Sequence, residues 1–240
     1  MSEKDPIRRR VWDRLEADDI ARFPFPPHGR ITNFDGADAA AERAVSLPEL
    51  ADADAVKANP DAPQLPLRRK LLHNGTTVYM AVPRLAADRP FVELDPEEIS
   101  DLDAAATISQ MSNYGRKVGP EEVPPLDAIV VGSVAVTEDG ARVGKGEGYS
   151  DLEYAVLRGL ELVDDDTPVV TTVHDVQLLE EEVDTERYDV PIDVVCTPTR
   201  TVRTETTRPR PTGIFWDDLD SKRLEEIPVL DRLREEESDG

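Results

Sequence analysis

Residues 144–151 of this chain read GKGEGYSD, so that three alternating glycines stand between an apolar segment and an amphipathic helix. The apolar segment, Ala128 to Val136 (AIVVGSVAV), is typical of a strand buried in a parallel sheet. Glycines lack a Cβ, so the backbone of this loop can approach a ligand closely. The free N–H groups at the start of the following helix favour an anion. The stretch therefore predicts a strand–loop–helix unit with a nucleotide-phosphate site.

The helix after the loop has its own sequence signals. Ser150 and Glu153 match the S-x-x-E pattern of a capping box. Four apolar residues then fall on one helical face: Leu152, Val156, Leu160 and Val163. The loop is not a Walker A motif, because Gly146 follows Lys145, and its glycine spacing differs from the dinucleotide fingerprint. A tight turn that binds no ligand is the alternative interpretation.

Strand and helix patterns alternate along the rest of the chain. The periodicity predicts helices over residues 6–21, 37–47, 67–73, 101–112 and 150–163, and strands over 55–57, 77–82, 128–136, 168–173 and 192–197. This alternation predicts an α/β fold of Rossmann-like type, with a mostly parallel sheet and helices on both faces. Ligands of such sheets bind beyond the carboxyl ends of the strands, which is where the glycine loop falls.

Composition limits the classes of function. The chain has 240 residues and is long enough for one large domain, which we favour over two small ones. Its 51 acidic and 28 basic residues give a net charge of −23, the wrong sign for a nucleic-acid surface. An acidic surface that is poor in lysine fits a cytoplasm of high salt concentration. No long apolar run or signal-peptide pattern is present, so we expect a cytoplasmic protein with no membrane partner.

Three other features each allow two interpretations. Cys196, the single cysteine, lies in an apolar strand, which favours a buried small side chain over a catalytic thiol. His174 follows a strand and could be an acid–base group, but a hydrogen-bonded structural histidine is favoured, because no second histidine stands at ligand spacing. An arginine series resembles an RNA-binding arm, although the interleaved Glu205 favours a salt-bridged surface strand: Arg200, Arg203, Arg208 and Arg210.

Several separated segments resemble the 5-formyltetrahydrofolate cyclo-ligases, also called 5,10-methenyltetrahydrofolate synthetases. In the second half of the chain these are the Asp139-Gly140 turn, Arg142, the glycine loop, Gln177 and Asp189 to Thr197. The chain is most similar to the methenyltetrahydrofolate synthetase domain-containing branch, through Ile7-Arg8, Val11 to Asp13, Asn33-Phe34, Val56 to Gln64, Val131 to Val136, residues 144–155 and Thr197 to Arg200. The resemblance implies a cyclo-ligase-like α/β domain (NagB/RpiA/CoA transferase-like) over residues 1–216 and a helical, acidic tail over 217–240.

The resemblance also implies a reaction and a set of site residues. These enzymes use ATP to activate the formyl oxygen of 5-formyltetrahydrofolate, with Mg²⁺ on the phosphates. The residues expected to bind ATP are Lys4, Arg8, Gly144, Lys145, Gly146, Glu147, Gly148 and Tyr149. We expect Lys145 and Asp151 to be catalytic, and Asp151 to be the Mg²⁺ ligand. Each has a plainer alternative. Lys4 and Arg8 could form a solvated basic N-terminus, Asp151 could serve only the helix dipole, and Tyr149 could close the core instead of stacking on a ring.

The chain also departs from the family pattern. Leu152 stands where these enzymes usually carry a basic residue, and Lys145 and Glu147 stand where neutral residues are common. Lys145 could supply the missing charge, whereas Glu147 would repel phosphate unless it is neutralised. No counterpart of the glutamate near the pterin is visible around Asn33 to Ala41. Two functions therefore remain: an ATP- and Mg²⁺-dependent cyclo-ligase acting on a reduced folate or a related N-formyl compound, or a non-catalytic nucleotide- or folate-binding protein of the same fold.

Overall fold

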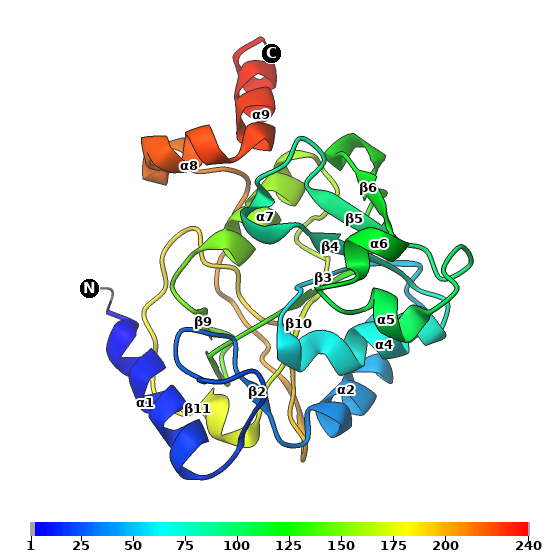
Figure 1. Cartoon of the computed structure of the whole chain (residues 1–240). Helices are drawn as coiled ribbons and strands as arrows, with labels where there is room; N and C mark the ends of the chain where they lie inside the picture. Colours follow the sequence, from blue (N-terminus) through cyan, green and yellow to red (C-terminus); the bar gives the residue numbers. More distant parts are fainter. Residues whose placement is uncertain (1–2, 240) are drawn as a thin grey trace.

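The computed structural model describes residues 3–239, apart from the side chains of Lys222 and of residues 235–239. An eight-stranded sheet lies at its centre, in the order β13-β12-β10-β7-β3-β4-β5-β6 (Figure 1). The strands span Thr201–Arg203, Val194–Cys196, Val169–Thr172, Ala128–Val131, Ala55–Ala58, Thr77–Ala81, Phe91–Leu94 and Arg116–Val118, in that order. The five strands from β12 to β4 are parallel, and the other three pair antiparallel at the edges. The mixed α/β fold with a mostly parallel sheet is therefore confirmed.

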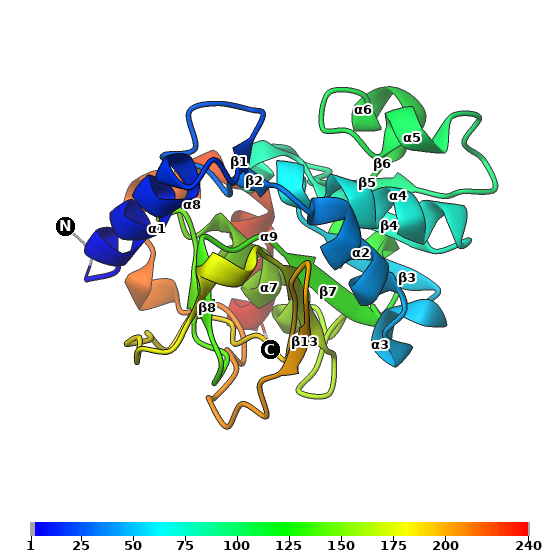
Figure 2. The same cartoon turned by 90° about the horizontal axis from the view of Figure 1, so that it is seen from below.

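Helices cover both faces of this sheet (Figure 2). In β7, Ala128 and Val130 pack with α2 and α4, whereas Ile129 and Val131 pack with α7. This separation follows from the alternation of side chains along a strand. The helices span Asp5–Ala17 (α1), Ala37–Val45 (α2), Pro48–Ala51 (α3), Leu65–His73 (α4), Leu102–Ala105 (α5), Met111–Tyr114 (α6), Tyr149–Gly159 (α7), Ser221–Glu226 (α8) and Pro228–Asp239 (α9).

Two small sheets flank the large one. Strands β1 (Ala21–Arg22) and β2 (Asn33–Phe34) form one, and β11 (Leu178–Leu179), β8 (Ala135–Thr137) and β9 (Arg142–Val143) form the other. Helix α1 buries Val11, Trp12 and Leu15 in an apolar cluster that also contains residues of β8 and β9. This packing holds the N-terminal helix beside the strand that leads into the glycine loop.

The structure corrects two predicted elements. The strand expected over residues 128–136 is two strands, β7 and β8, which belong to different sheets and are separated by Gly132-Ser133-Val134. The helix expected over residues 101–112 is the two short helices α5 and α6, and the Thr107 hydroxyl, which follows α5, donates to the Ala104 carbonyl oxygen. Hydrophobic periodicity does not reveal either interruption, since the apolar pattern continues through both.

The start of α7 also differs from the predicted capping box. The residue that precedes the helix is Gly148, in the left-handed region at φ 69°, and no side chain caps the helix. Ser150 instead accepts a hydrogen bond at its Oγ from Asn59 Nδ2 at 3.1 Å, and Glu153 forms an ion pair with Lys57. The two side chains expected to cap α7 therefore tie it to the segment that begins with β3.

Helices α8 and α9 pack on the α7 side of the sheet. Four buried residues at the end of α8 and in α9 belong to the same apolar cluster as α7: Ile227, Val229, Leu230 and Leu233. None of the described helices combines the length and the apolar character that crossing a lipid bilayer requires.

Candidate functional site

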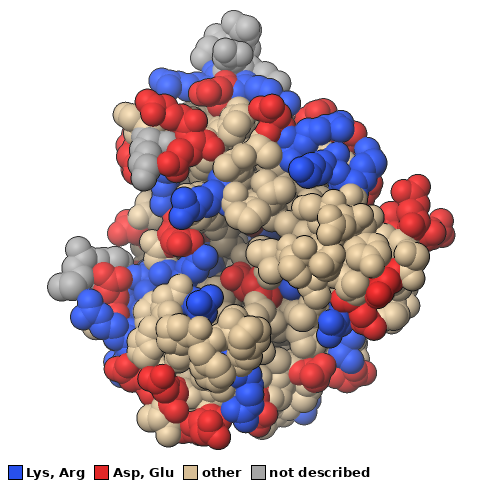
Figure 3. Space-filling view, in the orientation of Figure 1, with Lys and Arg blue, Asp and Glu red and all other residues tan. Residues whose placement is uncertain are grey.

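A cavity of about 1390 Å³ lies beyond the carboxyl ends of β3, β4 and β7. It appears in the space-filling view as a hollow where both basic and acidic side chains reach the surface (Figure 3). The residues predicted for ATP and Mg²⁺ all line it: Lys4, Arg8, Gly144, Lys145, Gly146, Glu147, Gly148, Tyr149 and Asp151. Positions far apart in the sequence thus meet at the edge of the sheet where a parallel α/β fold binds its ligands.

The backbone of the loop leaves its donors free. Among the described residues, none accepts a hydrogen bond from the backbone N–H groups of residues 144–151. Gly146 and Gly148 lie in the left-handed region, at φ 102° and φ 69°, which a side chain would disfavour. Unpaired N–H groups that continue into a helix N-terminus form an arrangement suited to phosphate.

Lys4 and Arg8 are not a solvated basic end. Arg8 is only 6% exposed, and its Nε donates to the Gly144 carbonyl oxygen at 2.7 Å while Nη1 contacts Asp5 at 2.6 Å. Lys4 forms an ion pair with Asp189 at 2.5 Å. Lys4, which precedes α1, and Arg8, which lies in α1, therefore both form part of the cavity wall. Arg8 also binds the glycine loop directly.

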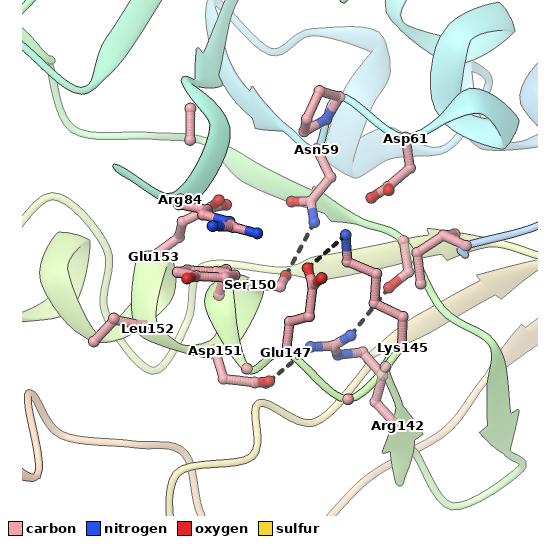
Figure 4. Close-up of a pocket in the computed structure, with 18 of the residues that line it drawn as sticks. Asn59, Asp61, Arg84, Arg142, Lys145, Glu147, Ser150, Asp151, Leu152 and Glu153 are labelled. Atoms are coloured by element: carbon pink, nitrogen blue, oxygen red, sulfur yellow. Dashed lines mark hydrogen bonds and ion pairs between the residues drawn. The ribbon is translucent and has the colours of Figure 1, made fainter. Parts of the chain in front are cut away.

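Lys145 and Glu147 neutralise each other within the loop. The Lys145 ammonium lies 2.7 Å from Glu147 Oε2 and points toward Asn59 and Asp61 (Figure 4). The repulsion that Glu147 would exert on a phosphate is therefore offset from inside the loop. Leu152 points away from Lys145 and is buried in the core, which explains why an apolar residue stands at this position.

Asp151 is held in an ion pair. Its Oδ2 accepts a hydrogen bond from Arg142 Nη2 at 2.9 Å, and its Oδ1 accepts one from the Val190 N–H at 3.2 Å (Figure 4). Arg142 Nη1 also donates to the Gly132 carbonyl oxygen. In the part of the chain that the structure describes, no group of three or more His, Cys, Asp or Glu side chains is arranged to hold a metal ion. The Mg²⁺ role of Asp151 stays a prediction.

A buried polar chain connects β3 to α7, and no sequence motif had indicated it. Lys57 is 1% exposed, forms an ion pair with Glu153, and donates to Asn59 Oδ1 at 2.5 Å. The Asn59 amide then donates to Ser150 Oγ at the start of α7 (Figure 4). The sequence signal that could have revealed this polar network is Lys57 itself, because a charged residue inside an apolar strand requires a partner.

Asp61 brings a further carboxylate to the cavity. It follows β3, and burial raises the pKa of its carboxyl group, an effect that the nearby charge of Lys145 partly offsets. No described residue donates a hydrogen bond or forms an ion pair with this carboxylate. A Cβ at Gly132 would lie 2.7 Å from Asp61 Oδ2, so a side chain at this position would displace the Asp61 carboxylate. Asp61 is thus an acidic residue at the cavity that lies outside the segment Asn33 to Ala41.

Arg84 stands at the rim of the cavity in the 3₁₀ turn Pro83–Leu85, which follows β4. Its backbone has φ 62°, an unusual conformation for arginine. The side chain is exposed, points into the cavity in Figure 4, and forms no ion pair or hydrogen bond with a described residue. Strained backbone of this kind is found at binding sites more often than elsewhere.

The remaining candidates lie outside the cavity lining. His174 accepts a hydrogen bond at Nδ1 from the Val176 N–H and packs edge-on against Phe34, and burial lowers its pKa. Cys196 is fully buried, and burial raises its pKa to about 11. The four arginines of the series each pair with an acid: Glu138, Glu49, Asp139 and Asp193 for Arg200, Arg203, Arg208 and Arg210. These are the structural interpretations favoured above.

Comparisons with known proteins point to one family. The sequence model of the 5-formyltetrahydrofolate cyclo-ligase family matches residues 2–198. The methenyltetrahydrofolate synthase domain-containing proteins of Mus musculus and Homo sapiens are 43% and 38% identical over 98% of this chain, which spans 64% and 62% of their lengths. The NMR structure of Aquifex aeolicus 5,10-methenyltetrahydrofolate synthetase, at 20% identity, superposes with a TM-score of 0.53, covering 87% of this chain and 96% of that one. The chain belongs to the 5-formyltetrahydrofolate cyclo-ligase family.

Proposed function

We propose that this member of the cyclo-ligase family is an ATP-dependent ligase that converts 5-formyltetrahydrofolate to 5,10-methenyltetrahydrofolate, or performs the same reaction on a related N-formyl compound. The observation that carries the proposal is the convergence of Lys4, Arg8 and the glycine loop on one cavity. Its volume of about 1390 Å³ exceeds the roughly 300–1,000 Å³ that serves one small ligand. Such a volume supports two substrates bound side by side.

In the proposed reaction, the formyl oxygen attacks the γ-phosphorus of ATP and ADP leaves. N10 then attacks the activated formyl carbon, loses its proton, and phosphate departs as the ring closes. Phosphoryl transfer is accelerated mainly by cations and amide donors that hold the phosphates in position. The unpaired N–H groups of residues 144–151 are donors of this type. Lys4, Arg8 and Lys145 supply the cations around them.

We propose that Mg²⁺ arrives with ATP instead of residing in the protein. Mg²⁺ usually keeps several waters and binds phosphate oxygens with one or two carboxylates. Both oxygens of Asp151 already accept hydrogen bonds, so a contact through water fits this residue better than replacement of Arg142. The ion would supply charge neutralisation at the β- and γ-phosphates.

We propose that Asp61 binds the pterin ring. The N3–H and the 2-amino group of a pterin are adjacent donors, and they match the two oxygens of a carboxylate that has no described donor of its own. Arg84 then offers a cation at the rim for a carboxylate of the glutamyl tail. The carboxylate and the guanidinium would thus recognise opposite ends of a reduced folate.

Turnover by the purified full chain tests the function. ATP, Mg²⁺ and 5-formyltetrahydrofolate, mixed with the protein at high salt, should yield ADP and the methenyl chromophore. Absence of both products with every formylated pterin tried would rule out the ligase reaction. A melting temperature that rises with ATP or folate, while no turnover occurs, would instead identify a binding protein of the same fold.

Replacing Asp61 by Asn should weaken folate binding and stabilise the free protein. Burial raises the pKa of the Asp61 carboxyl, so in the native state this group releases its proton at a higher pH than in the unfolded chain. Below the unfolded pKa the group has no effect, and as the pH rises toward the native pKa it increasingly destabilises the fold. We therefore expect D61N to raise the melting temperature at pH 8 but not at pH 3, and to lower folate affinity by roughly tenfold or more.

Asp88→Asn is the matched control for that experiment, because Asp88 lies outside the cavity lining. It should change neither the melting curve nor folate affinity. An unchanged folate dissociation constant in D61N, measured by fluorescence titration, would show that the pterin binds elsewhere.

Replacing Lys145 by Ala should lower ATP affinity without affecting the fold. Loss of a charge-assisted contact costs about 1.5–3 kcal/mol, which corresponds to roughly tenfold to a hundredfold in the dissociation constant. Stability should change by no more than about 0.5 kcal/mol, because the Lys145 side chain is partly exposed. Glu147→Gln should have the opposite effect on affinity, since it removes a negative charge from the loop. Calorimetric titration measures the dissociation constant for ATP in each variant. Equal dissociation constants for K145A and wild type would contradict the role of this lysine.

A further inference from the structure

A guanidinium from the C-terminal helices reaches the glycine loop. Arg223 of α8 donates from Nη2 to the Glu147 carbonyl oxygen at 2.5 Å. Its guanidinium also lies over the Tyr149 ring, 5.5 Å from the centroid, and a Cβ at Gly148 would be 3.2 Å from its Nη1. One side chain thus contacts Glu147 and Tyr149 and fills the space beside Gly148, at the loop–helix junction. This arginine lies beyond residues 2–198, the part that the sequence model of the family matches.

Arg223 is held in place by its own helix and not by an acid. Asp220 caps α8 by accepting the Arg223 N–H at 2.8 Å, and Ile227 after the helix is completely buried. Asp218, which lines the same part of the cavity, pairs with Arg187. Within the described residues, no carboxylate forms an ion pair with the Arg223 guanidinium. The strongest contacts of this cation are therefore made to the loop itself.

The hydrogen bond from Arg223 to Glu147 orients the peptide bond between Glu147 and Gly148. A trans peptide is planar, and its carbonyl and N–H point opposite ways. Holding the Glu147 carbonyl oxygen against α8 therefore turns the Gly148 N–H away from α8. Gly148 lines the cavity and is the last residue before α7, where an oriented N–H is most useful to an anion.

The loop needs such a restraint. Three glycines within five residues leave the free loop many backbone conformations, and ordering them at the moment of binding costs affinity. Arg8 holds the start of the loop through the Gly144 carbonyl oxygen, and Arg223 holds its end through that of Glu147. The two arginines come from opposite ends of the chain and fix the loop at both of its ends.

We propose that Arg223 is a positioning residue of the nucleotide site, by which the C-terminal helices preorganise the glycine loop for the phosphates of ATP. The proposal rests on the proposed function of the loop and extends it to residues beyond 216, the segment that the family resemblance sets apart as a tail. It assigns to α8 and α9 a purpose in binding, in addition to their packing on the core.

The test compares Arg223→Ala with Arg232→Ala in the full chain. Arg232 lies in α9, is about half exposed, and contacts Asp88 and Glu121 instead of the loop, so it controls for loss of a C-terminal arginine. We expect R223A to weaken ATP binding by about tenfold in calorimetry, because the loop then loses part of its preorganisation. R232A and wild type should bind equally. The KM for ATP should rise in R223A while the KM for the folate stays unchanged.

Two further measurements separate positioning from general stability. Arg223→Lys, which keeps the charge but not the planar guanidinium, should fall between wild type and R223A. Methylguanidinium added to R223A should recover part of the lost affinity, whereas it should not affect R232A. A dissociation constant for R223A within twofold of wild type would overturn the proposal while leaving the ATP site intact. If the wild-type chain does not bind ATP, both the proposed ATP site and the proposed role of Arg223 are wrong.

Discussion

Replacing Gly146 by Val is expected to abolish measurable ATP binding, with a loss of roughly a hundredfold or more in affinity. Gly146 has φ 102°, which a β-branched residue does not tolerate. A Cβ there would already lie 3.4 Å from Arg8 Cζ, so the larger isopropyl group would enter the space between the loop and Arg8. The loop must then change its conformation, and its N–H groups no longer face one phosphate.

Gly75→Val is the matched control for this prediction. Gly75 has a similar φ of 93°, but it follows α4 and lies outside the cavity lining, and a Cβ added to it would have no neighbouring atom within 4 Å. Both variants should therefore carry a similar backbone penalty, of about 1–2 kcal/mol. Only G146V should lose ATP binding in calorimetry. If G146V binds ATP as wild type does, the phosphates do not contact the glycine loop.

Replacing Lys57 by Met is expected to give the largest loss of stability. Lys57 and Glu153 form an ion pair in which the side chains are 1% and 8% exposed. Removing the lysine leaves the Glu153 carboxylate buried without its partner, which costs about 3–5 kcal/mol. Urea denaturation in concentrated KCl, in which the acidic surface is screened, measures this change in the free energy of unfolding.

The double variant K57M/E153L separates the two origins of that loss. An apolar pair of similar volume often replaces a buried ion pair without cost, so the double variant should recover most of the stability. Lys70→Met is the control, because Lys70 pairs with Glu42 at the surface and should contribute no more than about 1 kcal/mol. A K57M variant as stable as K70M would show that the charges of the buried pair are not required.

The strand–loop–helix unit and the identity of several cavity residues could be predicted from the sequence. Alternating glycines, apolar periodicity and the resemblance to a family are all local patterns. The structure contains β7, the glycine loop and α7 as expected, but β8 and β9 stand between β7 and the loop. The same patterns could not show that residues 128–136 divide between two sheets at Gly132. Periodicity reports which side chains are buried but not which sheet buries them.

Side-chain partners were the least predictable part of the site. Ser150 and Glu153 match a capping box by spacing, yet they bind Asn59 and Lys57, because the fold brings a segment from β3 against the start of α7. Asp61 lies in the family-like segment Val56 to Gln64, but no spacing in that segment shows that it faces the glycine loop. Its pKa is raised chiefly by burial, and the nearby Glu153 carboxylate raises it further.

The sequence by itself determined the class of fold, the glycine-rich loop before α7 and the basic residues near the N-terminus, because these depend on neighbours along the chain. The tertiary structure alone decided which groups meet across the cavity. Arg8 and Arg223 hold the same loop from opposite ends of the chain, and Asp61 faces it from the end of β3. Such contacts depend on how the sheet brings distant segments together. The spacing of residues within one segment does not specify which other segment it will meet.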